Sequence, residues 1–310
     1  MTEKTYPPLS DIPTHLRPED VKLIACDIDG TTLTSSHVIS PYTLETFRKV
    51  RHQRPDINIL FATGRPRIAT VAIREAMREL GHAVGIYLNG ALCGREDVEG
   101  QLKGGEDAKS SLDFHVLHET PLKPKDAVWY VQWAVRNQRC VVLYSYDTTI
   151  TPFDHPSCEL VQGASEPYPV EIPESDLIPQ ILSNTLKVHK MIFLGPKVPL
   201  DQTRTDLDSE STRPTSTSFL RNNNFSLEVV SKHTSKAAAL KFFTDNLAGC
   251  RLDNVIAFGD GDNDVEMIKE CGLGVGMGNG LAHVKKVAKY VAPTNDEDGV
   301  ARVLRGVLGL

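Results

Sequence analysis

Short apolar runs that stop at acidic or polar turns alternate with amphipathic segments in the first third of the chain, and this alternation constrains the fold most. The run over residues 22–26 ends abruptly at Asp27, as expected of a buried strand in a parallel sheet. A helix is predicted to follow, with Ser40 as its N-cap and Pro41 as its first residue. The next expected elements are a strand over residues 57–62, a helix over 67–80 and a strand over 85–88. This order predicts a βαβαβ beginning.

The last third of the chain repeats this rhythm. Its expected elements are a helix over residues 235–247, a strand over 254–258, a short helix through Val265 and Ile268, a strand near Gly274 and a final helix through Val300, Val303, Leu304 and Val307. We therefore predict an α/β fold with a doubly wound parallel sheet, formed by residues 21–91 and 230–310. Residues 1–20 form a polar extension in this prediction.

The middle of the chain, residues 92–229, has a different pattern. Its strands look antiparallel in character, at residues 114–118, 140–146, 187–194, 216–220 and 225–230, with a helix over 124–137. We interpret this segment as an inserted α+β domain. The tract 201–214 has almost no large apolar residues, so we expect a loop or a solvated helix with nothing to bury.

Length and charge limit the classes of protein that fit. The chain has 310 residues, about twice the roughly 150 residues typical of one domain, which agrees with two domains. Its net charge is -6, and no dense block of Lys or Arg is present, which argues against a nucleic-acid partner. No apolar run approaches the roughly 18 to 20 residues of a membrane span, and the first 20 residues do not resemble a secretory signal. We expect a cytoplasmic monomer or homodimer without a membrane partner.

The cysteines are scattered along the chain and form no CxxC pair. They are Cys26, Cys93, Cys140, Cys158, Cys250 and Cys271. This spacing favours buried, reduced thiols over disulfides or a zinc site.

Three polar motifs directly follow predicted strands. They are the runs DIDGT at 27–31, TGR at 63–65 and GDGDND at 259–264. In a doubly wound parallel sheet, ligands bind at the carboxyl ends of the strands, so these distant motifs are expected to meet at one edge. Several carboxylates at one edge repel one another unless a cation neutralises them. Oxygen donors without Cys or His indicate a hard ion, and Mg²⁺ suits a site that also holds a phosphate.

Each motif also has a plainer interpretation. An Asp-x-Asp pair at a strand end often caps the next helix or forms a turn, so this pair alone leaves both interpretations open. A calcium loop is excluded, because Val265 stands where that loop needs glycine and Cys271 where it needs glutamate. The glycine-rich run 272–280 does not satisfy GxGxxG, so we expect no dinucleotide site.

Taken in order, these runs resemble the haloacid dehalogenase superfamily, and within it the Cof-type subfamily (subclass IIB), whose large C2 cap is inserted after the third strand. The matching runs are DIDGT at 27–31, FATGR at 61–65, YLNGA at 87–91, SKAAAL at 235–240, GDGDND at 259–264, GVGMGNG at 274–280 and EDGVA at 297–301. They cover both core segments. The middle segment resembles the family cap only in position, size and strand richness.

The resemblance implies a role for each matching acidic residue. Asp27 would be the nucleophile that forms an aspartyl-phosphate, and Asp29 the acid and base that serves the leaving alcohol and the attacking water. Mg²⁺ would be held by the carboxylates of Asp27 and Asp260, by the backbone carbonyl of Asp29, and by Asp264 directly or through water.

The resemblance also implies a clamp for the phosphate group. Its expected members are the Thr63 hydroxyl, the Gly64 amide and the Lys236 ammonium, with Asn263 positioning either Lys236 or a phosphate oxygen. Taken alone, Thr63 would be a helix cap and Lys236 a solvated lysine. Lys232 is an alternative clamp lysine, and Arg65 meets either the substrate, the cap or a surface salt bridge.

The implied function is a Mg²⁺-dependent phosphatase for small phosphorylated metabolites, such as sugar phosphates or related phosphomonoesters. Asp29 argues against a dehalogenase or an ion pump of the same superfamily. A phosphomutase would use the same Asp27 and Asp29, so it stays open, as does a sugar-phosphate-binding protein without catalysis. The sequence leaves the identity of the substrate open.

Overall fold

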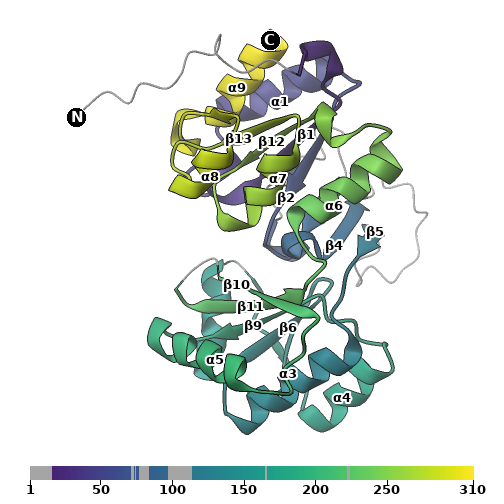
Figure 1. The fold of residues 1–310 in the computed structure, drawn as a ribbon, viewed down its shortest axis with the longest axis vertical. Coiled ribbons are helices and arrows are strands. Elements are labelled where there is room, and N and C mark those ends of the chain that lie inside the picture. The colour runs from purple at the N-terminus through teal and green to yellow at the C-terminus, as the bar shows by residue number, and fades with distance from the viewer. Residues whose placement is uncertain are drawn as a thin grey trace. The chain divides into compact units, whose positions relative to one another are not determined.

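The computed structural model describes residues 16–70, 73, 75–76, 84–96, 114–164, 166–221 and 224–310, which form two compact units (Figure 1). We call the first the core unit; it comprises the described residues within Met1–Gly64, Val71–Leu117 and Ser235–Leu310. We call the second the inserted unit; it comprises Arg65–Thr70 and the described residues of His118–Thr234. No helix in the described ranges is both long and apolar enough to cross a membrane.

The core unit is built on an eight-stranded sheet in the order β14-β13-β12-β1-β2-β3-β4-β5. Its strands are β1 (Leu23–Asp27), β2 (Asn58–Ala62), β3 (Val84–Tyr87), β4 (Leu92–Glu96), β5 (Phe114–Glu119), β12 (Val255–Gly259), β13 (Leu273–Gly276) and β14 (Tyr290–Val291). The six strands from β14 to β3 run parallel, whereas β4 pairs antiparallel with β3. The predicted α/β fold class is confirmed.

Helices cover both faces of this sheet, because successive side chains of a strand point to opposite faces. On one face, Ile24 and Cys26 belong to a buried cluster with α1 (Pro41–Gln53) and α9 (Gly299–Leu308), which lie side by side (Figure 1). On the other, Leu23 and Ala25 pack with α6 (Lys236–Phe243) and α7 (Val265–Glu270). Within the described residues the core unit also has α8 (Ala282–Val287). The strand β1 is therefore buried on both faces.

The predicted start of α1 is confirmed in detail. The Ser40 hydroxyl accepts a hydrogen bond from the Thr43 amide at 3.0 Å, and Pro41 is the first helical residue. Proline suits this position because its missing N–H would have no partner within the helix.

The inserted unit has a six-stranded sheet in the order β10-β11-β9-β6-β7-β8. Its strands are β6 (Val141–Ser145), β7 (Thr148–Thr151), β8 (Val170–Glu171), β9 (Lys190–Leu194), β10 (Thr217–Leu220) and β11 (Ser226–Ser231). All pairs are antiparallel except β7 with β8. The helices α3 (Pro124–Arg136), α4 (Glu174–Leu182) and α5 (Lys197–Ser209) contribute to one buried cluster with β6, β9 and β11.

Three details differ from the sequence-based expectations. Residues 114–119 form the edge strand of the core sheet, so the core unit extends to Leu117, beyond residue 91. The tract expected to bury nothing lies largely in α5, which buries Leu207 completely. The predicted helix 67–80 falls partly outside the described residues, and its first turn, Arg67–Thr70, is a 3-10 helix.

Candidate active site

Parallel pairing brings the three polar motifs to one edge of the core sheet. Strand β1 lies between β2 and β12, with Asp27 in register with Ala62 and Cys26 with Phe258. Asp27, Thr63 and Asp260 therefore stand at or just after the ends of three neighbouring strands. A hydrogen bond of 3.2 Å from the Thr31 hydroxyl to Asp260 Oδ1 joins loops that are 229 residues apart.

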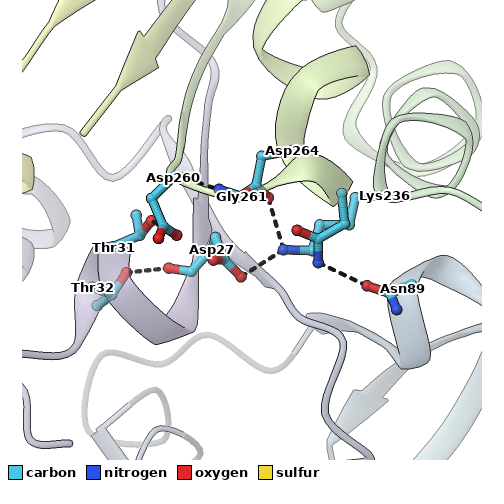
Figure 2. A network of polar contacts seen from close by, with 9 residues as sticks. Asp27, Thr31, Thr32, Asn89, Lys236, Asp260, Gly261 and Asp264 are labelled. Carbon is cyan, nitrogen blue, oxygen red and sulfur yellow. Dashed lines mark hydrogen bonds and ion pairs between the residues drawn. The ribbon is translucent and has the colours of Figure 1, made fainter. Parts of the chain in front are cut away.

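A buried lysine links two of the carboxylates. Lys236 Nζ donates to Asp27 Oδ1 at 2.5 Å and to Asp264 Oδ1 at 2.7 Å (Figure 2). Lys236 and Asp264 are completely buried, and the Asp27 side chain is 9% exposed. The Ser235 hydroxyl caps α6 by accepting from the Ala238 amide, which fixes Lys236 as the first residue of this helix.

Burial and the repulsion between carboxylates shift the pKa values of these groups. Burial raises the pKa of Asp27 well above its ordinary value, and Asp264 adds to this effect, while Lys236 opposes it. Burial, together with Asp264, raises the pKa of Asp260 to about 6. Burial alone would lower the pKa of Lys236, but the carboxylates of Asp264 and Asp27 outweigh it and raise that pKa. With one ammonium among three carboxylates, the site favours an additional cation.

Three carboxylates have oxygens close enough to share a metal ion. Ligand atoms of Asp27, Asp260 and Asp264 lie within 4.8 Å of one another. Asp264 is already engaged on both oxygens, because Oδ1 accepts from Lys236 while Oδ2 accepts from the amides of Asp260 and Gly261, each at 3.0 Å. Asp27 and Asp260 are thus better placed for direct contact with an ion, and Asp264 for contact through water. The donors are oxygens only, which fits Mg²⁺.

Gly30 allows the loop after β1 to approach Asp260. Its backbone has a φ of +70°, and a Cβ atom there would lie 2.4 Å from Asp260 Oδ2. The Asn279 side chain donates to the Gly30 carbonyl at 2.7 Å and holds this loop in place. Any side chain at position 30 would displace Asp260.

Asp29 is in a more open position than Asp27. Its side chain is 40% exposed, and its Oδ1 lies 3.7 Å from His37 Nδ1. The turn that carries it, Ile28–Thr32, is fixed by a hydrogen bond of 2.6 Å from the Thr32 hydroxyl to the Asp27 carbonyl. An exposed carboxyl next to a buried one can exchange protons with water.

The phosphate-binding candidates Thr63 and Gly64 follow β2. Thr63 is buried; its amide donates to the Ile86 carbonyl at 2.8 Å, and its carbonyl accepts from the Asn89 amide at 2.9 Å. Asn263 donates to Asn89 Oδ1 at 2.8 Å. Asn89, which is labelled in Figure 2, therefore bridges the loops after β2 and β12 through these two contacts.

The sequence reasoning gave no role to Asn89, although it lies within the run YLNGA. Its signal is the Asn-Gly pair that follows Leu88, just after the end of β3. Asn89 has a φ of +59° and Gly90 one of +103°, and a Cβ on Gly90 would lie 2.2 Å from the Ser235 carbonyl oxygen. These two residues pack the turn against the start of α6.

Arg65 belongs to the inserted unit, although it directly follows the Thr63-Gly64 pair. Its Nη1 donates to the Ala69 carbonyl at 3.3 Å. Its neighbour Arg67 makes an ion pair with Asp147, so this short segment is bound to the inserted unit by charge.

The comparison with protein families agrees with this geometry. Residues 24–304 match the model of a family described as haloacid dehalogenase-like hydrolase. The chain belongs to this family. The resemblance inferred from the seven sequence runs is confirmed.

Several relatives of this haloacid dehalogenase-like hydrolase match it over most of its length. The 5-amino-6-(5-phospho-D-ribitylamino)uracil phosphatase YcsE of Bacillus subtilis is 27% identical over 286 residues, which cover 92% of this chain and 95% of YcsE. A chloroplastic endoribonuclease, YBEY of Arabidopsis thaliana, is also 27% identical over 286 residues, but this chain spans only 45% of that protein's length. A crystal structure of a haloacid dehalogenase-like hydrolase from Bacteroides thetaiotaomicron has a TM-score of 0.73 and 28% identity, and covers 92% of this chain and 98% of its own.

In this haloacid dehalogenase-like hydrolase, the polar groups have separate environments at one sheet edge. Asp27 is buried against a fixed ammonium, Asp260 is oriented by a hydroxyl, and Asp29 is open to solvent. Such an arrangement can combine a nucleophile, a cation and a proton carrier around one bound group.

Proposed function

We propose that this hydrolase is a Mg²⁺-dependent phosphatase that removes phosphate from small metabolites through an aspartyl-phosphate on Asp27. The observation that carries this proposal is the position of Asp27, buried between the ammonium of Lys236 and the carboxylate of Asp260 (Figure 2). A carboxylate fixed in this way is oriented for attack on phosphorus.

The reaction takes place in two transfers. In the first, a carboxylate oxygen of Asp27 bonds to phosphorus while the bond to the departing alcohol breaks, and Asp29 gives its proton to that alcohol. In the second, water attacks the phosphorus of the aspartyl-phosphate and Asp29 takes the water proton. Inorganic phosphate leaves and the Asp27 carboxylate is regenerated. The 40% exposure of the Asp29 side chain supports its exchange of protons with solvent.

The proposed Mg²⁺ ligands are Asp27, Asp260 and the Asp29 carbonyl, with Asp264 acting through water. The all-oxygen donor set of the three carboxylates supports a hard ion. When bound, the ion would offset charge on the non-bridging phosphate oxygens, an effect worth several kcal/mol in the transition state.

The proposed phosphate clamp consists of Thr63, Gly64 and Lys236. Hydrogen bonds to two carboxylates fix the position of the buried Lys236 ammonium. Its positive charge is therefore already in place before a phosphate binds. Asn263 contacts Asn89, and we propose that this contact positions the Thr63-Gly64 turn around the phosphate. In this respect the role of Asn263 is indirect.

The substrate class is proposed from the relatives and from the inserted unit. YcsE is named for a phosphate ester of a ribityl compound, so phosphorylated sugars and sugar alcohols are the first class to test. We propose that the inserted unit, the cap of this family, selects the group that carries the phosphate.

A substrate panel tests the proposal. With Mg²⁺, purified protein should release phosphate from p-nitrophenyl phosphate and rank sugar and sugar-alcohol phosphates by kcat/KM. Asp27→Asn should abolish release, whereas Asp262→Asn, at a side chain 61% exposed beside His283, should leave it unchanged. Activity that survives in Asp27→Asn would contradict the mechanism. Conversion of a hexose 1-phosphate to its 6-phosphate isomer without free phosphate would favour a mutase instead.

A further inference from the structure

Two buried cysteines of the inserted unit lie in contact. Cys140 directly precedes β6, and Cys158 lies in the 3-10 helix Pro156–Ala164. Their sulfur atoms are 3.5 Å apart, and both residues are almost fully buried, at 2% and 0% exposure. A disulfide has a sulfur–sulfur distance of about 2.05 Å, so the pair needs to close by roughly 1.5 Å. The proposed phosphatase reaction uses neither thiol.

The other four cysteines have different surroundings. Burial raises the pKa of both Cys93 and Cys271 to about 12, and it also raises the pKa of Cys26 and Cys250. In contrast, the hydrogen bond between the two thiols lowers the pKa of Cys158 and raises that of Cys140. Since the thiolate is the nucleophile, this pair is the reactive one.

A cavity gives small molecules access to Cys140, one member of the pair. It has a volume of about 180 Å³, and its lining includes Cys140, Arg139, His155, Ser157 and Thr203. Water occupies roughly 30 Å³ per molecule in the liquid, so the cavity has room for a small oxidant such as hydrogen peroxide.

We propose that Cys140 and Cys158 form a reversible intramolecular disulfide when hydrogen peroxide oxidises the protein. The thiolate of the pair attacks one peroxide oxygen, and the oxygen–oxygen bond breaks. Hydroxide departs, and the attacking cysteine becomes a sulfenic acid. The second sulfur then attacks the first, the sulfur–oxygen bond breaks and water leaves. Two thiols and one peroxide thus give one disulfide and two waters, and a dithiol reductant reverses the change.

Peptide mapping of the full-length protein tests this proposal. The chain has no Lys or Arg between Cys140 and Cys158, so trypsin leaves both in one peptide, whereas chymotrypsin can cut at Tyr144, Tyr146 and Phe153. After mild peroxide treatment and alkylation under denaturing, non-reducing conditions, we expect a chymotryptic pair linked through these two cysteines. The link should disappear after treatment with dithiothreitol, with recovery of two free thiols.

Serine variants provide the controls. Cys140→Ser and Cys158→Ser should each lose the linked peptide, whereas Cys93→Ser, at a buried cysteine of the core unit, should retain it. If a single variant fails to fold, the wild-type map alone decides. Peroxide treatment that leaves both cysteines open to alkylation, links either one to another cysteine, or produces only sulfinic acid would overturn the proposal.

Discussion

Lys236 Nζ lies 2.5 Å from Asp27 Oδ1, so the residue that begins α6 is bonded to the residue that ends β1. The same ammonium contacts Asp264 at 2.7 Å. Because Lys236 and Asp264 are completely buried, neither charge is compensated by water. The lysine thus serves the fold as well as the proposed phosphate clamp.

Lys236→Met should therefore destabilise the protein strongly. Removing one partner of a buried ion pair costs about 3 to 5 kcal/mol, because the remaining carboxylates are left uncompensated. The measurement is the free energy of unfolding in urea. The matched control is Lys241→Met on the same helix, whose exposed pair with Asp245 should contribute under about 0.5 kcal/mol. Equal effects of the two substitutions would disprove the structural role of Lys236.

Gly30→Ala should reduce activity through Asp260. The added Cβ would lie 2.4 Å from Asp260 Oδ2, so that carboxylate must move. We expect a higher Mg²⁺ concentration for half-maximal activity and a kcat reduced at least about tenfold, as a small misplacement of catalytic groups does. Gly249→Ala is the control, because its φ is also positive, at +59°, yet no atom lies within 4 Å of its added Cβ. Gly249→Ala should have the same cost of a left-handed alanine, roughly 1 to 2 kcal/mol, and keep normal activity.

Mg²⁺ should stabilise the folded protein. A ligand that binds only the folded state adds about 2.7 kcal/mol at one hundred times its dissociation constant, so the melting temperature should rise with Mg²⁺ and fall with chelator. Asp260→Asn should abolish this rise, because it removes a proposed direct ligand. Asp262→Asn should keep it. A Mg²⁺-dependent rise that persists in Asp260→Asn would place the ion elsewhere.

The inserted unit should lose stability in mild acid because of His189. This side chain is completely buried, with Nε2 3.0 Å from Glu119 Oε2, and burial lowers its pKa below 6.5 although Glu119 opposes the shift. Below about pH 6.5 the unfolded state therefore binds a proton at His189 more readily than the folded state does. The free energy of unfolding is highest above that pH and decreases as the pH falls. Burial would raise the pKa of Glu119, but hydrogen bonds from Lys187, His189 and Tyr146 lower it, which adds a loss at more acidic pH.

Melting curves between about pH 7.5 and pH 5.5 check this prediction. In His189→Gln, the side chain cannot titrate, so the melting temperature should fall less over this interval than in the wild type. His283→Gln is the comparison variant, because it replaces a histidine that is 56% exposed. A wild-type slope retained in His189→Gln would contradict the assignment.

The meeting of the proposed catalytic residues at one edge of the sheet was predictable because it follows from one topological rule. Asp27 and Asp260 come directly after buried strands, and Thr63 follows a third, so parallel pairing alone brings them together. Lys236 was predictable only through its motif, since a lysine at a helix start is usually solvated.

Contacts that depend on loop geometry were not predictable. Asn263 donates to Asn89, which stands in a left-handed turn, and the sequence did not indicate this contact. The expected role of Asn263 toward Lys236 or a phosphate oxygen stays a prediction. The pattern of residues 114–118 predicted a strand, yet the pattern does not specify which sheet the strand joins. The tract 201–214 was expected to bury nothing because it has so few large apolar residues. A few buried side chains, among them Leu200 and Leu207, are nevertheless enough to pack α5.

The position of β1 between β2 and β12 has a consequence for synthesis on the ribosome. β2 emerges soon after β1, whereas β12 begins at residue 255, after the whole inserted unit has been made. Until then one edge of β1 presents unpaired amide and carbonyl groups, the kind of edge that associates with other chains. A nascent chain at this stage carries Asp27, the proposed nucleophile, but not Asp260 or Asp264. The enzyme therefore pairs the second edge of β1 and completes its proposed metal site in the same late step, and chaperone demand should be greatest just before it.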